Sequence, residues 1–402
     1  MLNRMKLFTR NISNLKNIKN KTNKLGWLII AIFILVVVAK IIEISKMRSS
    51  KCSSIQLSFT DPNIISIAVN QKDFQNPLYD YYIKSAYNCC AISKFSNSYV
   101  DLCALDNVIK SGVRFLDFEI YSMGGYKPVV GVSNLNTNNV KESYNQLELS
   151  SVLENINRNA FTSAIGCKNP DDPVFLHFRV KSNHKEVYNN IAKALTNTFD
   201  VEDQLLGKDF SNAFNGYNLG KIPLHTLSKN GKFGDITNRK AKVVIIVDSS
   251  NKTYLDTDLK ELVNMESGSN FMNLKQTFNI KTDQNKKALI ENNKHNITVV
   301  TPDRIPEGGD TSSLQCCVPG SQNPDFKTSY EVGCQIVCMC FQNNDTNLKN
   351  YNKFFHSNGT AFVLKPESLR YKQVCIDKPV KQKKSNSFAT RTVSDDYYSF
   401  NI

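Results

Sequence analysis

Histidine is scarce in this chain, and no arrangement of its histidines matches a common catalytic motif. Only five histidines occur among 402 residues, and none pairs with another at the spacing of metal ligands. The chain also lacks a P-loop, a G-x-G-x-x-G after a strand, a G-x-S-x-G elbow and an H-E-x-x-H sequence. These absences exclude the usual nucleotide-binding, serine-hydrolase and zinc-peptidase motifs. The histidines are His177, His184, His225, His295 and His356.

Acidic residues are absent from the first 24 positions, where seven lysines and arginines stand. Part of the formal net charge of +14 is therefore concentrated on one short arm. Basic proteins often bind nucleic acid, but a basic arm beside an apolar run fits an anionic membrane surface better. We therefore expect a membrane partner for this arm and no nucleic acid.

The apolar run begins with LGWLIIAIFILVVVA and covers residues 25–44. Twenty helical residues rise about 30 Å, which is the thickness of the hydrocarbon core of a bilayer. The alternative is a cleaved signal peptide. The long basic arm, the length of the run and the lack of an A-x-A site argue against cleavage. The sequence predicts a single-pass membrane anchor.

The charges that flank the anchor predict its orientation. Seven basic residues precede it and four follow it closely. The excess on the first side predicts a cytosolic N-terminus and a lumenal or extracellular large domain. All 11 cysteines lie beyond the anchor, which fits an oxidising compartment. Because 11 is odd, at least one cysteine stays unpaired within a single chain. Counted from Ala39, where the unbroken apolar run ends, the four basic residues that follow are Lys40, Lys46, Arg48 and Lys51.

Short apolar strands and amphipathic helices alternate through the rest of the chain. The strands have the length and composition of buried strands, and the helices repeat apolar residues at helical spacing. This alternation predicts an α/β fold with a parallel sheet covered by helices, either closed or open. The predicted strands are 113–121, 173–181, 242–247, 296–302, 333–341 and 360–366, and the helices are 147–161 and 185–199.

Several sequence words follow one another in the order of a known enzyme family. YYIKSAYNCC (81–90), VIKSGVRFLDFEIY (108–121) and PVFLHFRVKSN (173–183) resemble the X region of eukaryotic phosphoinositide-specific phospholipases C. The words G-C-Q-I-V, F-Q, N-G and V-L-K-P-x-x-L-R in residues 333–371 resemble the Y region of that family. The resemblance implies an incomplete TIM-type barrel that spans roughly residues 74–375. Its site would lie at the C-terminal ends of the strands.

This resemblance and the composition together divide the chain into seven parts. The anchor would supply the membrane attachment, because no segment is left for the other modules of the family. The parts are a basic arm (1–24), the transmembrane anchor (25–44), a connector (45–73), an X-like half barrel (74–200), a linker (201–240), a Y-like half barrel (241–375) and a mobile tail (376–402).

The resemblance also places the catalytic positions. In the family reaction, the inositol 2-hydroxyl attacks the neighbouring phosphodiester, with two histidines and a calcium ion assisting. The first histidine belongs to an S-[SA]-H-N word, which this chain writes Ser85-Ala86-Tyr87-Asn88. The second follows a P-V-V word, and here that position is Val132. Tyr87 and Val132 are therefore degenerate positions, and we expect no catalytic residue at either.

The calcium ligands of the family are only partly kept. Asn88 retains the amide ligand, and Asp117 and Glu119 retain two carboxylates. The next acidic ligand corresponds to Arg179, whose guanidinium cannot bind a cation. We predict an internal cluster of Arg179 with the carboxylates in place of the metal, and expect no cofactor. The alternative is that Arg179 points to solvent. Arg304 matches an arginine that contacts inositol in the family.

These positions predict a membrane-anchored phospholipase C-like pseudoenzyme that serves as a binding or structural module. Its partner would be an inositol lipid or another protein. One alternative is an atypical phosphoric diester hydrolase acting on phosphatidylinositol or a related lipid. A second alternative is a sensor of inositol-lipid headgroups without turnover. His177 shares strand parity with Arg179, and a core histidine is a simpler interpretation than a relocated acid.

Overall fold

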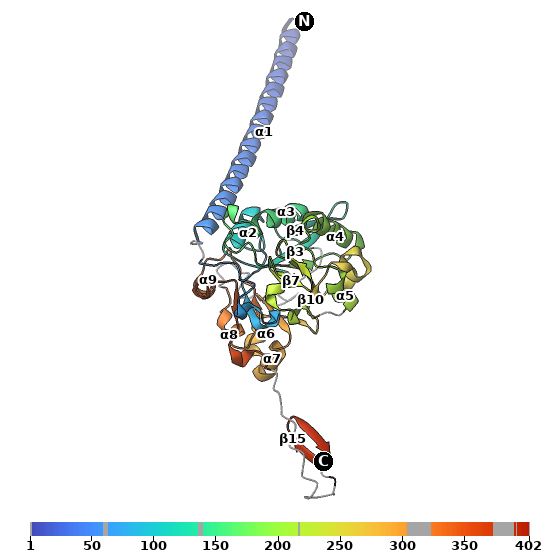
Figure 1. The fold of residues 1–402 in the computed structure, drawn as a ribbon. Coiled ribbons are helices and arrows are strands. Elements are labelled where there is room, and N and C mark those ends of the chain that lie inside the picture. The colour runs from blue at the N-terminus through green and yellow to red at the C-terminus, as the bar shows by residue number, and fades with distance from the viewer. Residues whose placement is uncertain are drawn as a thin grey trace.

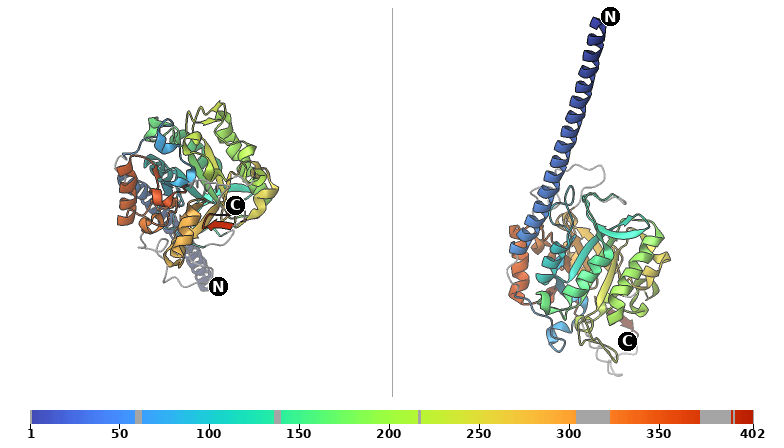
Figure 2. Two further views of the ribbon diagram at one scale, coloured as in Figure 1. Left: turned by 60° about the horizontal axis from the view of Figure 1, so that its bottom comes forward. Right: turned by 90° about the horizontal axis from the view of Figure 1, so that it is seen from above.

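The computed structural model describes residues 2–58, 63–135, 140–215, 218–303, 323–372, 390 and 392–401. Figure 1 shows a long helix, α1, that projects from a body of strands and surrounding helices. The two views in Figure 2 show the same projection from other sides.

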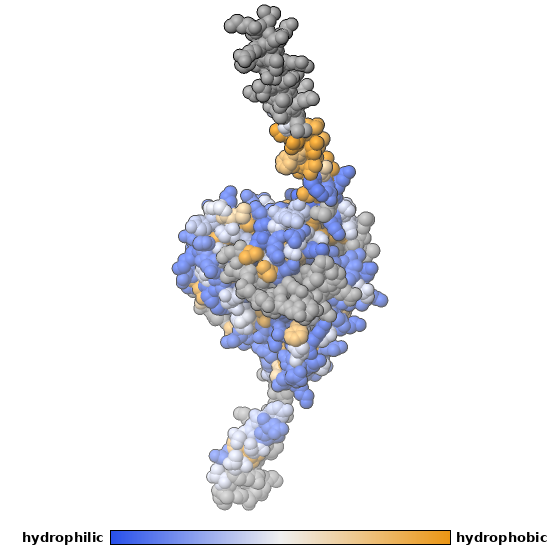
Figure 3. All heavy atoms as spheres, turned by 180° about the vertical axis from the view of Figure 1, so that it is seen from behind, coloured by the Kyte–Doolittle hydropathy of each residue, from blue (hydrophilic) through white to orange (hydrophobic). Residues whose placement is uncertain are grey.

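Helix α1 (Leu2–Ser58) contains the predicted anchor and continues beyond it. Its stretch Gly26–Ile55 is long and apolar enough to cross a membrane, although a signal sequence near an N-terminus has the same properties. Figure 3 shows apolar side chains, in orange, gathered on the projecting part of this helix. The connector predicted for 45–73 is therefore helical as far as Ser58. The anchor and its polar continuation form one uninterrupted helix.

The strands form two larger sheets. One sheet has the order β11-β12-β13-β1-β14, and the other has the order β10-β9-β6-β3-β4-β5 with β2 also paired to β3. The first sheet comprises β1 (Tyr81–Ile83), β11 (Met272–Gln276), β12 (Ile297–Thr301), β13 (Ile336–Val337) and β14 (Phe362–Leu364). The second comprises β2 (Ser85–Ala86), β3 (Phe115–Met123), β4 (Lys127–Gly131), β5 (Leu147–Glu148), β6 (Val174–Val180), β9 (Val243–Asp248) and β10 (Met265–Ser267).

The two sheets meet on one side only within the described residues. A parallel bridge between Ala86 and Met339 joins β2 to the segment that follows β13. On the other side, β10 is followed closely by β11, but no ladder between these two strands occurs in the described part of the chain. The result is a barrel of mainly parallel strands with one open seam, to which β4, β5 and β14 add antiparallel strands, in agreement with the predicted incomplete barrel.

Helices cover the outside of this barrel. Helices α3 (Leu149–Ala160) and α4 (Lys185–Phe199) lie close to the ranges expected from their apolar periodicity. Each buries one face, as Leu153 and Leu195 illustrate. The remaining helices of six residues or more between the strands are α2 (Leu102–Lys110), α6 (Thr277–Thr282), α7 (Lys286–Asn293) and α9 (Thr346–Asn358), and the shorter α5 (Asn212–Asn215) and α8 (Phe326–Tyr330) add single turns.

The segment predicted to be a linker, 201–240, is part of the packed body. It has no long helix or strand among its described residues, but Leu219, Leu224 and Leu227 are fully buried. A small hairpin of β7 (Lys232–Phe233) and β8 (Ile236–Thr237) lies within it. It is an ordered long loop, because its leucines belong to the main core.

The tail predicted to be mobile lies partly outside the described residues. Its last ten described positions form an antiparallel hairpin of β15 (Thr392–Asp395) and β16 (Tyr398–Asn401). This part of the tail therefore has regular structure that the sequence pattern did not predict.

Asp172 gives the fold a testable pH dependence. Its two oxygens accept hydrogen bonds from the Ile67 N–H (2.7 Å) and the Asn169 amide (2.9 Å). Burial raises the pKa of Asp172 to about 6, although the Arg114 charge and these hydrogen bonds oppose the shift. The folded pKa lies above the unfolded value near 3.9. The contribution of Asp172 to the free energy of unfolding is therefore most favourable below pH 4 and is lost as pH rises through 6.

We expect Asp172 to lower the free energy of unfolding by up to about 3 kcal/mol between pH 4 and pH 7. Urea unfolding at several pH values checks this, with Asp172→Asn for comparison. The difference in stability between wild type and variant should change across this interval. A difference that is constant with pH contradicts the raised pKa.

Candidate functional site

Four of the predicted site residues lie together at the C-terminal ends of strands. Asn88 follows β2, whereas Asp117 and Glu119 lie on β3 and Arg179 lies on β6. In the parallel ladder, His177 pairs with Asp117 and Arg179 pairs with Glu119. Since side chains alternate along a strand, the side chains of these two pairs all lie on the same face of the sheet, toward the barrel interior. The alternative that Arg179 points to solvent is wrong, because only 4% of this residue is exposed.

The Arg179 guanidinium contacts every oxygen-bearing side chain of this group. Its Nε and Nη2 donate to the two oxygens of Asp117 at 2.9 and 2.7 Å. Its Nη1 donates to Glu119 Oε1 at 2.8 Å, and Nη2 also donates to Asn88 Oδ1 at 2.8 Å. The bond to Asp117 is bidentate, which matches the fork of a guanidinium to a carboxylate. We call Asn88, Asp117, Glu119 and Arg179 the arginine cluster.

Tyr87 supports the arginine cluster from one side. Its ring centroid lies 4.4 Å from Arg179 Cζ, within the range of a cation–π contact. The ring also packs edge-on against Phe95, with centroids 5.7 Å apart. Next to it, Asn88 has a positive φ of 47°, a left-handed conformation that asparagine tolerates. This turn brings the Asn88 N–H to 3.1 Å from Asp117 Oδ1.

The charges of the arginine cluster stabilise one another. Burial by itself disfavours a charged Asp117, but the Arg179 charge and the hydrogen bonds from His177 and Arg179 outweigh it. The pKa of Asp117 is therefore held well below its usual range. Burial likewise disfavours the charged form of Arg179, but Asp117, Tyr87 and Glu119 together raise its pKa well above the usual value. The buried ion pair stays fully charged at neutral pH.

His177 lies directly beneath the arginine cluster and belongs to a second hydrogen-bonded series. Its Nδ1 is 2.7 Å from Asp117 Oδ2, and its Nε2 is 2.8 Å from the hydroxyl of Ser267 at the end of β10. An ionised carboxylate only accepts, so Nδ1 carries a proton. His177 and Ser267 are both fully buried. Ser267 was not predicted, because a three-residue strand carries no recognisable motif.

Two segments close the barrel over these residues. One is the loop 88–101, which follows β2, and the other consists of residues 132–135 and 140–145, which follow β4. They are joined by hydrogen bonds from Tyr144 N to Ser98 O (2.8 Å) and from Asn97 N to Glu142 O (3.2 Å). The second segment also contacts the cluster, because Ser133 N donates to Glu119 Oε2 at 3.0 Å. We call the two segments the closing loops.

Comparison with known proteins identifies the fold around this site. Residues 74–220 match the family described as phosphatidylinositol-specific phospholipase C, X domain. These residues are similar to a phospholipase C X domain, and we call them the X domain below. The match begins at the predicted boundary of 74 and extends past the predicted end at 200. No curated protein matches the chain. The resemblance of residues 333–371 to the Y region stays a prediction.

Solved structures agree with this family at the level of the fold. The structure of L. pealei PLC21 matches with a TM-score of 0.53 and 17% identity, covering 77% of this chain and 39% of that chain. The structure of S. officinalis PLC21 matches with a TM-score of 0.52 and 17% identity, covering 82% and 41%. The chain therefore spans only about two fifths of the length of these two proteins.

The X domain of this chain does not fit the calcium ion that the resemblance implies. The space between Asn88, Asp117 and Glu119 is filled by the Arg179 guanidinium, which uses oxygens of all three. A cation there would meet a buried positive charge and would find its ligands already engaged. The residues present form an ion pair network with one another.

The two positions predicted to be degenerate lie beside this network. Tyr87 and Val132 are both about 1% exposed, and Val132 has no group that can transfer a proton. Arg304, the predicted inositol contact, lies outside the described residues.

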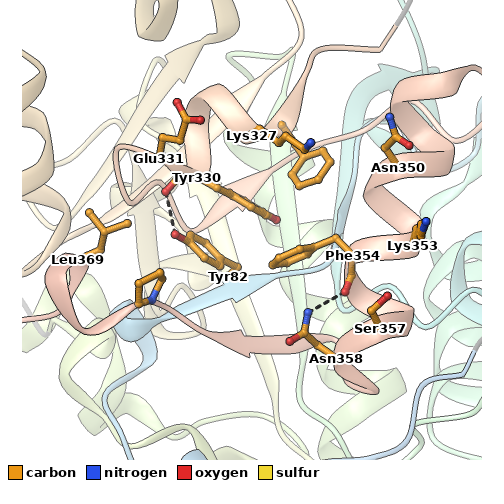
Figure 4. Close-up of a pocket in the computed structure, with 12 residues that line it drawn as sticks. Tyr82, Lys327, Tyr330, Glu331, Asn350, Lys353, Phe354, Ser357, Asn358 and Leu369 are labelled. Atoms are coloured by element: carbon orange, nitrogen blue, oxygen red, sulfur yellow. Dashed lines mark hydrogen bonds between the residues drawn. The ribbon is translucent and has the colours of Figure 1, made fainter.

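A cavity of about 660 Å³ lies away from the X-domain site. Its aromatic wall includes Tyr82 from β1, Tyr330 from α8 and Phe354 from α9, which Figure 4 shows converging. Tyr82 and Tyr330 stack with centroids 4.0 Å apart, and the Tyr82 hydroxyl donates to Tyr330 O at 2.8 Å. None of the arginine cluster lines this cavity, so it supplies no route to the buried carboxylates.

Proposed function

We propose that this chain is a membrane-tethered, catalytically inactive phospholipase C-like barrel that serves as a binding or structural module. The observation that carries this proposal is the position of Arg179. Its guanidinium bonds to Asn88, Asp117 and Glu119 at once and takes the place of a catalytic cation. A site whose ligands are closed by an internal arginine has no need of a metal and no means of holding one.

The groups around the cluster offer no substitute for the lost chemistry. General acid–base groups contribute roughly 10²–10⁴-fold each, and metal stabilisation contributes several kcal/mol. Val132 cannot transfer a proton, and the Tyr87 ring is engaged beneath Arg179. The closing loops further separate the carboxylates from solvent, since Asp117 and Glu119 are fully buried. Loss of both histidines and of the cation should therefore abolish nearly all acceleration.

The hydrogen-bonded series Asp117–His177–Ser267 favours a second candidate function, an atypical phosphoric diester hydrolase. A base held between a carboxylate and a hydroxyl is a recurring catalytic arrangement. The full burial of His177 and Ser267 argues against it, because a lipid diester cannot reach either group in this structure. The same contacts fit a core histidine whose two nitrogens are satisfied by neighbours.

Membrane attachment through α1 completes the proposal. Residues 25–44, at the apolar end of the stretch Gly26–Ile55, would supply the span, and the charges around them favour a large domain in the lumen or outside the cell. A disulfide between Cys52 and Cys103 supports this side, because such bonds persist in oxidising compartments. An inositol lipid or a protein would be the binding partner.

We expect no phosphodiester cleavage by the purified full chain in mixed micelles. Phosphatidylinositol and its phosphorylated forms should give no turnover above buffer, with calcium or with chelator. The physical reason is that Tyr87 and Val132 occupy the positions of the two family histidines and that Arg179 engages the oxygens a calcium ion would need. Release of water-soluble inositol phosphate from radiolabelled lipid measures this directly.

The same assay separates the two candidate functions. Cleavage that persists in chelator and disappears in His177→Ala would support the atypical hydrolase and contradict the pseudoenzyme. His295→Ala is the matched control, since the half-exposed His295 ring lies on the surface beside Glu291 and Tyr371. Saturable headgroup binding without cleavage would identify an inositol-lipid sensor.

A further inference from the structure

The polar end of α1 is fastened to the barrel at three successive positions. Arg48 forms an ion pair and a hydrogen bond with Asp101. Cys52 forms a disulfide with Cys103. Ile55 is 5% exposed and packs in a small separate core with Ile92 and Ala104.

These contacts lie on one face of the helix. Positions 48, 52 and 55 are spaced by four and three residues, so their side chains point in the same direction. A fourth contact strengthens this face, because Arg48 Cζ also lies 5.6 Å from the Tyr99 ring centroid. The ion pair is partly exposed and contributes little by itself. The disulfide and the buried Ile55 make the attachment firm.

The order of the contacts gives the direction in which α1 leaves the barrel. From Ile55 toward Arg48, the partners change from Ala104 to Cys103 and then to Asp101. Helix α1 therefore runs in the same direction as α2, whose N-cap is Asp101. A helix that follows a barrel strand begins at the C-terminal end of that strand. The anchor accordingly departs on the same side of the barrel as the arginine cluster.

The interface also reaches the closing loops. Asp101 N donates to Cys90 O at 2.8 Å, and Ile92 N donates to Tyr99 O at 3.3 Å, so the contacts of α1 lie on the loop that follows Asn88. Asn145 of the other closing loop bonds the Val100 N–H at 2.9 Å and the Val100 carbonyl at 2.8 Å. The helix and the closed end of the barrel are therefore mechanically connected.

We propose that residues 45–58 of α1 are a rigid strut that holds the barrel with its closed, strand-end face toward the lipid surface. The proposal rests on the membrane anchoring proposed above. The rise from Ile44 to Arg48 is about 6 Å and from Ile44 to Ile55 about 17 Å along the helix axis. These distances place the loop 88–101 beside the lipid headgroups, with the opposite end of the barrel directed away from the bilayer.

Energy transfer from the protein to the membrane tests the strut. The full chain is inserted into phosphatidylcholine vesicles that contain a trace of acceptor-labelled lipid. A fluorescent amino acid replaces either Lys94, exposed in the loop 88–101, or Val201, exposed just after α4 at the other end of the barrel. Transfer should be several-fold more efficient from position 94 than from position 201.

A variant that releases the strut should remove this difference. In the triple variant Arg48→Glu, Cys52→Ser and Cys103→Ser, transfer from the two positions should become similar. Lys51→Glu is the matched control, because Lys51 is exposed on the same turn of α1. Circular dichroism shows whether the barrel of the triple variant remains folded.

The possible outcomes are distinct. Equal transfer from positions 94 and 201 in the wild type overturns the strut, without any need for a variant. Unequal transfer that the folded triple variant preserves overturns the role of this interface. A chain that fails to sediment with the vesicles contradicts the membrane anchoring itself and thus the function proposed above.

Discussion

Replacing Arg179 with alanine is expected to lower the free energy of unfolding by about 3–5 kcal/mol, because it leaves buried carboxylates without a partner. Asp117 and Glu119 are fully buried and bond the guanidinium directly. Asp117 keeps its bonds to His177 and to the Asn88 N–H, but these do not neutralise its charge. Urea unfolding of the full chain in detergent micelles measures the loss.

Two further variants make this prediction specific. Arg179→Lys should recover only part of the stability, because an ammonium cannot form the bidentate bond to Asp117. Arg239→Ala removes an exposed arginine and should change stability by less than about 0.5 kcal/mol. Equal losses in Arg179→Ala and Arg239→Ala would show that the arginine cluster does not hold the barrel together.

Removing the disulfide between Cys52 and Cys103 should cost about 2–4 kcal/mol, because the bond restricts the unfolded chain. The two cysteines are separated by 51 positions, so the closed loop is long. Thermal unfolding of the Cys52→Ser, Cys103→Ser double variant in non-reducing buffer measures this effect. Reducing agent should destabilise the wild type by a similar amount.

A control on the same turn of α1 distinguishes the bond from a general effect of substitution. Ser53 is exposed, so Ser53→Ala should leave the unfolding temperature nearly unchanged. An unfolding temperature of the double variant that equals the wild-type value would mean that the bond does not form in the folded chain. In that case, mass spectrometry of unreduced peptides from the wild type would find Cys52 and Cys103 as free thiols.

The arginine cluster could be predicted from sequence because two independent regularities agree on it. Asp117, Glu119 and Arg179 alternate with apolar residues in continuous strand patterns, which places them on one face. The resemblance of the motifs at 108–121 and 173–183 to the X region then predicts that their two strands are neighbours in the barrel. Their contacts follow from strand parity and charge. Local pattern and tertiary arrangement coincide at these positions.

Other features depend on contacts that no local pattern carries. Ser267 reaches His177 past the intervening strand β9, from a strand of three residues that is too short for a recognisable period. The closing loops meet through Glu142 and Asn145, which have the appearance of ordinary loop residues. Their partners lie 45 positions away in the case of Asn145 and Val100. Only the folded chain brings these groups together.

The continuation of α1 beyond the anchor carries only a weak sequence signal. Residues 45–58 are mostly polar, so no wide apolar face indicates a helix. Arg48, Cys52 and Ile55 nevertheless recur at helical spacing. Three residues at this spacing can be recognised as a docking face only when their partners, Asp101, Cys103 and Ile92, are known. The helix is stabilised there by docking rather than by its own composition.

The most direct test of the central claim is a calorimetric titration of calcium into the full chain in detergent micelles. If Arg179 takes the place of the cation, the wild type should show no saturable heat. Arg179→Glu, which places a third carboxylate beside Asp117, Glu119 and Asn88, should gain one calcium site and calcium-dependent stability. Arg179→Gln should bind no calcium. Saturable binding of one calcium ion by the wild type, abolished by Asp117→Asn, would contradict the claim that the arginine replaces the metal.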